Sequence, residues 1–156
     1  MILYHASYTE IKTPDTLHSR EDIDFGRGFY LTSIKGQAIN YAQRFIRRGK
    51  DAWLNIYEFN ISTDEWKILN FEAYDSDWLD FISQCRAGKD DTDYDIVIGG
   101  IANDRVIQTL DRYFAGELNS EQTLGLLKYE KPNIQYCIRS QKMLDKCLIH
   151  IRSTNL

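Results

Sequence analysis

Short apolar segments of strand-like composition alternate with segments of helical periodicity along the whole chain, and this succession limits the possible folds more than any other feature. Strands are expected at 2–5, 29–33, 54–61, 95–99, 134–138 and 148–151. Helices are expected at 38–46, 76–86 and 106–114, after a cap at Ser120, and around Met143 and Leu144. No repeat, linker or change of composition divides the chain. We therefore expect one α+β domain over residues 1–156.

Composition excludes several classes of protein. The 156 residues are 43% hydrophobic and 13% aromatic, which is too apolar for a disordered chain. The net charge is −4 and no dense Lys/Arg block is present, so the sequence lacks the electrostatic signature of general nucleic-acid binding or of an acidic membrane surface. Small neutral or anionic ligands at local sites remain compatible with this composition.

The cysteines and histidines do not predict a disulfide framework or a metal site. Cys85, Cys137 and Cys147 are odd in number and widely spaced, so we expect reduced thiols. His18 and His150 do not combine with them at metal-ligand spacing, and we expect no metal. The chain starts directly with strand-like sequence and has no long apolar span, which predicts a cytoplasmic protein without membrane contact. Delivery into another cell by a specialised secretion machine is also compatible with this start.

Two segments stand out as candidates for chemistry: Tyr4-His5-Ala6-Ser7, and Gly28-Phe29-Tyr30-Leu31-Thr32. Taken alone, a single His or Tyr in a strand is more often an ordinary buried residue. Their context changes this interpretation. Residues 3–7 and 24–33, followed by a helix with Gln37-Ala38 and Tyr41-Ala42, resemble the first half of ADP-ribosyltransferases of the diphtheria-toxin and poly-ADP-ribose-polymerase type.

A second resemblance covers nearly the whole chain. It is to a bacterial family catalogued as a domain of unknown function and thought to share the transferase fold. The segments that carry it are Ser19-Arg20, 24–26, 28–32, 78–81, 94–99, 102–106 and 135–137. The two resemblances together imply an ADP-ribosyltransferase-like split β-sheet core flanked by helices, with NAD as substrate.

The resemblance implies a role for each matching residue. His5 would hydrogen-bond a ribose hydroxyl of NAD, and Tyr30 would stack against nicotinamide. The backbone of Ala6 would grip the carboxamide, at a position where the transferases have Gly. Ser7, Gly28, Phe29, Thr32 and Asn103 would belong to the NAD-binding segments. Arg20 would bond the pyrophosphate, or would form a surface ion pair with Asp24.

The third position of the transferase pattern departs from the expected residue. A Glu normally occupies it, whereas the matching segment here offers Gln135. A Gln can bond a hydroxyl, but it cannot place a negative charge beside developing positive charge, which typically costs about 2.7–4 kcal/mol. Asp104 is the candidate for a replacement carboxylate. Its alternative role is capping the helix that follows, which Asn103 could also cap.

The leading functional hypothesis is NAD-dependent mono-ADP-ribosyl transfer to a protein or nucleic-acid acceptor, as an effector in a bacterial toxin–antitoxin or defence system with a neutralising partner. NAD glycohydrolase activity is the second hypothesis. The third is a catalytically silent module that binds NAD or ADP-ribose, and it is motivated by Gln135.

Overall fold

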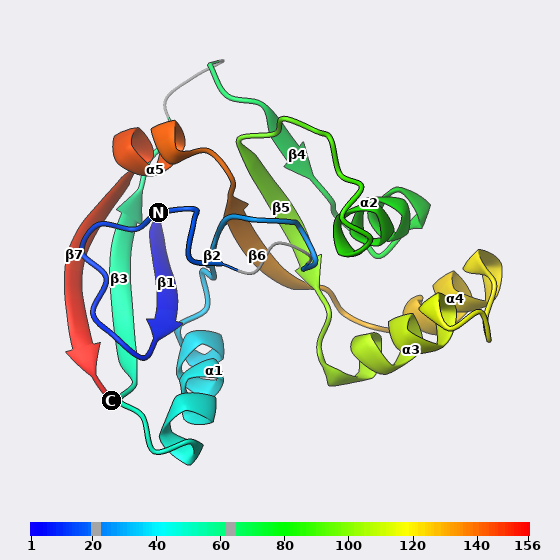
Figure 1. The fold of residues 1–156 in the computed structure, drawn as a ribbon, viewed down its shortest axis with the longest axis horizontal. Coiled ribbons are helices and arrows are strands. Elements are labelled where there is room, and N and C mark those ends of the chain that lie inside the picture. The colour runs from blue at the N-terminus through cyan, green and yellow to red at the C-terminus, as the bar shows by residue number, and fades with distance from the viewer. Residues whose placement is uncertain (20–22, 62–64) are drawn as a thin grey trace.

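The computed structural model describes residues 1–19, 23–61 and 65–156, and these form an α+β fold of five helices and seven strands (Figure 1). The strands are β1 (Ile2–Ser7), β2 (Phe29–Leu31), β3 (Trp53–Phe59), β4 (Ile68–Asn70), β5 (Ile96–Ile101), β6 (Asn133–Ile138) and β7 (Leu148–Asn155). The helices are α1 (Lys35–Arg47), α2 (Ser76–Arg86), α3 (Asp104–Phe114), α4 (Ser120–Leu127) and α5 (Gln141–Cys147).

The strands form two sheets. Sheet A has the order β1-β3-β7 and is antiparallel throughout. Sheet B has the order β2-β6-β5-β4, with β4 parallel to β5 and the other pairs antiparallel. An isolated bridge between Tyr4 and Thr32 connects the two sheets.

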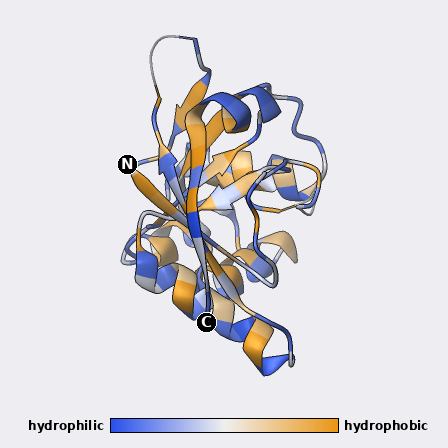
Figure 2. Ribbon diagram, turned by 90° about the vertical axis from the view of Figure 1, so that its left-hand side faces the viewer, coloured by the Kyte–Doolittle hydropathy of each residue, from blue (hydrophilic) through white to orange (hydrophobic). Residues whose placement is uncertain are grey.

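The helices and sheets pack in layers around three clusters of buried side chains. The central cluster lies between the sheets and joins Leu3 and Tyr57 of sheet A to Leu31 and Ile138 of sheet B. Helix α1 covers the other face of sheet A, and α2, α3 and α4 cover the other face of sheet B (Figure 1). Figure 2 shows mainly hydrophobic strands and helices with alternating hydrophobic and hydrophilic bands, as expected when each helix buries one face.

The expected strands and helices are present, and the differences have local causes. The sequence did not predict β4, because a three-residue strand at the edge of a sheet leaves no measurable alternation. Strand β7 continues to Asn155 through polar residues, since it pairs with β3 along its length. Helix α4 is capped by Asn119 and not by Ser120, which is its first helical residue. Within the described ranges, no helix is long and apolar enough to cross a membrane.

Candidate functional site

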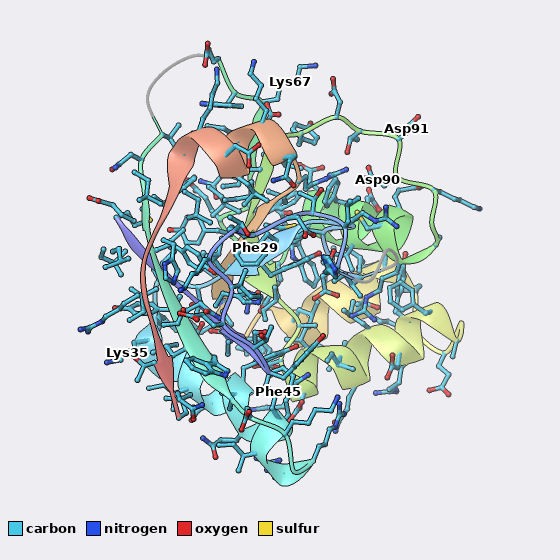
Figure 3. The ribbon with its side chains drawn as sticks, turned by 60° about the vertical axis from the view of Figure 1, so that its left-hand side comes forward. Phe29, Lys35, Phe45, Lys67, Asp90 and Asp91 are labelled. Carbon is cyan, nitrogen blue, oxygen red and sulfur yellow. The ribbon has the colours of Figure 1, made fainter. Side chains whose placement is uncertain are left out.

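The first strands of the two sheets, β1 and β2, meet at one point and then diverge. Two backbone hydrogen bonds join Tyr4 and Thr32, with N–O distances of 2.8 and 3.0 Å. Beyond this bridge the side chain of His5 spans the gap, with its Nδ1 2.7 Å from the backbone oxygen of Tyr30. The imidazole also stacks on Phe29, at 4.3 Å between ring centroids. Phe29 lies in the interior of the molecule (Figure 3), so His5 occupies the junction of the two sheets.

The surroundings of His5 fix its protonation state. A carbonyl oxygen only accepts hydrogen bonds, so Nδ1 carries the proton that bonds the Tyr30 carbonyl. Burial lowers the pKa of His5, and the hydrogen bond to Tyr30 opposes this shift to a smaller extent. The ring is therefore neutral at pH 7 and its Nε2 has a free lone pair. In this state Nε2 can accept a hydrogen bond from a ligand hydroxyl.

Tyr30 uses its hydroxyl to hold the preceding turn. The hydroxyl donates to the Gly26 oxygen at 2.6 Å and accepts from the Phe25 nitrogen at 3.1 Å. Burial raises the pKa of Tyr30 far above its ordinary value, so the phenol stays protonated. Successive strand residues point to opposite faces, so the Tyr30 ring lies on the face of sheet B away from Phe29 and the His5 ring. The structure thus joins His5 to the Tyr30 backbone but not to the Tyr30 ring.

Gly28 brings the turn before β2 close to β6. A Cβ at this position would lie 2.6 Å from the Cys137 sulfur and 2.8 Å from the Ile138 oxygen, so no side chain fits. The Gly28 nitrogen also donates to the Ser19 hydroxyl at 3.0 Å. Gly28 therefore allows the backbone before β2 to lie close to β6, which explains why glycine occupies this position. Phe29 and Leu31 point into the core, as expected from the sequence.

A chain of polar side chains connects the end of β2 to the start of β6. Thr32, which is buried, donates from its hydroxyl to the Gln37 side-chain oxygen at 2.8 Å. The Gln37 amide in turn donates to the side-chain oxygen of Asn133. This link fixes the first turn of α1 against both strands and lines the sheet junction with amide groups. Sequence reasoning named Thr32 but missed Gln37 and Asn133, since no signal in the sequence pairs residues 96 positions apart.

Gln135 lies on β6 opposite Gly99. It is two residues from Cys137, which pairs with Tyr30, so Gln135 and Tyr30 share one face of sheet B. Within the described part of the chain, the Gln135 amide makes no hydrogen bond. Its side-chain oxygen is half-buried and available to a ligand, but it supplies no charge.

The model of one protein family matches residues 1–150 of the chain. The chain belongs to the DUF3990 family. That family is described as proteins of unknown function, and the match confirms the expected membership of a domain-of-unknown-function family. No curated protein and no solved structure matches the chain.

Ala6 and Ser7 of this DUF3990 domain end β1 next to His5, and both are buried. Ala6 packs between the sheet and α1, in the cluster with Ala38 and Ala42. The Ser7 hydroxyl accepts from the Thr9 nitrogen at 3.2 Å and so stabilises the turn after the strand. Close packing of β1 against α1 therefore explains the small side chain at position 6, independently of any ligand contact by the Ala6 backbone.

The remaining predicted residues lie away from this junction or have local partners. Asn103 caps α3, because its side-chain oxygen accepts from the Val106 nitrogen at 2.9 Å. Asp104 is an exposed residue of the first turn and not the cap. Arg20 lies outside the described residues. Its suggested partner Asp24 forms an ion pair with Arg86 at 2.6 Å, which ties the turn to α2.

Two surface cavities of the DUF3990 domain, about 520 and 550 Å³ in volume, are lined by other residues than His5, Tyr30 and Gln135. They flank the loop between α2 and β5. Within residues 1–19, 23–61 and 65–156, no group of three or more His, Cys, Asp or Glu residues is placed to hold a metal ion. The three cysteines are buried free thiols, and burial raises the pKa of Cys85 and of Cys137 to about 12. These thiols are therefore protonated and poor nucleophiles.

Proposed function

We propose that this protein is an NAD-dependent mono-ADP-ribosyltransferase that binds the nicotinamide ribose at the junction of its two sheets and transfers ADP-ribose to a macromolecular acceptor. The observation that carries the proposal is the state of His5, which is neutral, held by the Tyr30 carbonyl and protonated on Nδ1. A ribose presents hydroxyl donors, and an imidazole nitrogen with a free lone pair is their natural acceptor.

The fold supports this proposal. Two sheets that are joined by one bridge between Tyr4 and Thr32 are compatible with the split sheet that the resemblance to ADP-ribosyltransferases implies. The His5 and Tyr30 segments come together at that split, and α1 follows directly after Thr32. The Thr32–Gln37–Asn133 link adds amide donors and acceptors beside it.

In the proposed reaction the bond between nicotinamide and the ribose breaks, and its electron pair leaves with nicotinamide. An acceptor nucleophile bonds the same ribose carbon and releases a proton to solvent. His5 holds the ribose by a hydrogen bond at Nε2. Gln135 lies on the other face of sheet B from the His5 ring and carries no charge, so the site around His5 offers no carboxylate to the developing positive charge and turnover is slow.

A silent NAD-binding module is the second candidate, and the uncharged Gln135 is the observation that favours it. Hydrolysis of NAD is the third, with water in place of the acceptor. The three differ in products: modified macromolecule and nicotinamide for transfer, free ADP-ribose and nicotinamide for hydrolysis, and neither for a silent module.

The test is incubation of the pure protein with NAD labelled in the adenylate part, with and without cell lysate, while nicotinamide release and labelled macromolecules are measured. We expect slow release that depends on lysate and label in the macromolecular fraction. His5→Asn should abolish this release, whereas Gln135→Glu, on the other face of sheet B from the His5 ring, should leave it nearly unchanged. No release above background by the wild type would contradict transfer and leave the silent module.

A further inference from the structure

One face of α1 carries a stripe of residues that starts at the candidate site. Gln37, Tyr41, Arg44 and Arg48 follow one another at spacings of four, three and four, which places them in a row on a helix. Gln37 at the start of the row is bonded to Thr32 and, through Asn133, to β6. The other three residues are exposed. The stripe therefore leads from the sheet junction outward along the helix.

Exposed aromatic rings and cations alternate on this surface. The Arg44 guanidinium lies 3.7 Å from the centroid of the Tyr41 ring, and the Lys50 ammonium lies 5.2 Å from the centroid of Tyr8. Phe45 lies between the two tyrosines, with ring-centroid distances of 5.8 Å to Tyr41 and 6.1 Å to Tyr8. Tyr8 is 58% exposed and Tyr41 44% exposed. A cation lies over one face of each tyrosine ring, and the exposed remainder of the ring can contact a ligand next to that cation.

Two segments of the chain carry locally unbalanced charge. Residues 35–50 contain five Lys or Arg and no Asp or Glu, although the whole chain has a net charge of −4. Residues 70–95 contain eight Asp or Glu and only two Lys or Arg. Helix α1 lies in the lower part of Figure 1 and α2 in the upper right, and Phe45 and Asp90 are correspondingly apart in Figure 3. The surface of α1 and the loop after it is therefore locally basic and suits an anionic partner.

We propose that the exposed surface formed by Tyr41, Arg44 and Arg48 of this stripe together with the neighbouring Tyr8 and Lys50 binds single-stranded nucleic acid. We further propose that this polymer is the acceptor presented to the His5 site, which rests on the proposed function. Arg and Lys neutralise phosphates, and the tyrosines stack on unpaired bases.

The rings favour a single strand over the other anionic partners. An acidic polypeptide would use the cations but has no flat surface for two exposed tyrosines. The bases of a duplex are already stacked on each other, so they are closed to the rings. The net charge of −4 lacks the electrostatic signature of general nucleic-acid binding, but it is compatible with a local basic surface of this kind. The sequence could not show this surface, because Tyr8 joins α1 only through the fold.

The binding test uses fluorescent 20-mers of mixed sequence, as single-stranded RNA and DNA, with fluorescence anisotropy and no NAD. We expect binding that weakens with salt, with a slope of log K on log salt of about −2 for three phosphate contacts. The double variant Arg44→Glu, Arg48→Glu should weaken binding at least tenfold, and the neutral pair Arg44→Gln, Arg48→Gln should weaken it less. Arg112→Glu with Lys128→Glu, the same charge change on α3 and after α4, should leave it unchanged.

Three outcomes would overturn the binding proposal: no binding of either oligonucleotide at low salt, equal loss of affinity in the control variant, or a duplex or polyglutamate bound as tightly as the single strand. The acceptor is tested by adding labelled NAD to the bound oligonucleotide. Label on the oligonucleotide is expected. If the oligonucleotide stays unlabelled while macromolecules of a lysate are labelled, the acceptor is refuted and the transferase remains. Oligonucleotide binding without any nicotinamide release would refute the proposed function, and the acceptor with it, but would leave the binding surface.

Discussion

His5 is covered by Phe29, has a fixed tautomer and lies beside the bridge that joins the two sheets. Each property has a separate physical origin: Phe29 stacks on the ring and covers it, the Tyr30 carbonyl selects the proton on Nδ1, and a single bridge joins the two sheets beside it. A histidine with a purely structural role usually has hydrogen-bond partners at both ring nitrogens, whereas among the described residues only Nδ1 of His5 has one. The pKa of this residue gives a first test.

Stability should decrease in acid because of His5. Above about pH 6.5 the ring is neutral in the folded and the unfolded chain, and the free energy of unfolding is not affected by its titration. Below that pH the unfolded chain binds a proton that the folded ring resists, since burial lowers its pKa. Urea unfolding of wild type and His5→Asn at pH 7.5 and 5.5 should therefore show a larger acid loss for the wild type. Equal losses would mean that His5 titrates normally.

Gly28 gives the clearest steric prediction. Gly28→Ala should destabilise the protein by about 1–3 kcal/mol, because the new methyl group meets the Cys137 sulfur and the Ile138 backbone. Gly36→Ala is the matched control, since a Cβ there has no neighbour within 4 Å and Ala favours the helix by about 1 kcal/mol. Thermal unfolding of both variants measures the difference. A Gly28→Ala protein as stable as the wild type would show that β2 and β6 are less closely packed.

At the level of elements, the caps determine where helices begin. Asn103, Asn119 and Ser140 accept hydrogen bonds from the first turns of α3, α4 and α5. The sequence allowed either Asn103 or Asp104 to cap α3, because both side chains suit the position. In the structure Asn103 caps α3. Asp104 does not cap the helix, and it remains a candidate for the replacement carboxylate.

Variants of this pair separate capping from catalysis. Asn103→Ala should cost about 1 kcal/mol of unfolding free energy, since it leaves the Val106 amide without its partner. Asp104→Ala should cost about 0.3–1 kcal/mol, through the helix dipole alone. Denaturant unfolding gives both values. A larger cost for Asp104→Ala would reverse the assignment, and a loss of nicotinamide release without a stability change would give Asp104 a chemical role.

At the level of the whole molecule, the sequence predicted most elements but little of the site's geometry. Local periodicity gave the strands and helices, and the resemblance gave His5 and Tyr30. The bonds that build the junction join distant residues, such as Gln37 to Asn133 and Asp24 to Arg86. A strand pattern also does not say which face a ring takes, so the separation of the Tyr30 ring from His5 emerged only from the fold.

The central claim is that NAD binds at the junction of the sheets through His5, and calorimetric titration with NAD tests it most directly. Asn can keep the bond from its amide to the Tyr30 carbonyl but has no counterpart of Nε2, so His5→Asn removes the ligand contact selectively. We predict binding by the wild type and by His18→Asn, an exposed control, and at least tenfold weaker binding by folded His5→Asn. Equal affinity of His5→Asn and wild type, or no binding by the wild type at millimolar NAD, would contradict the account.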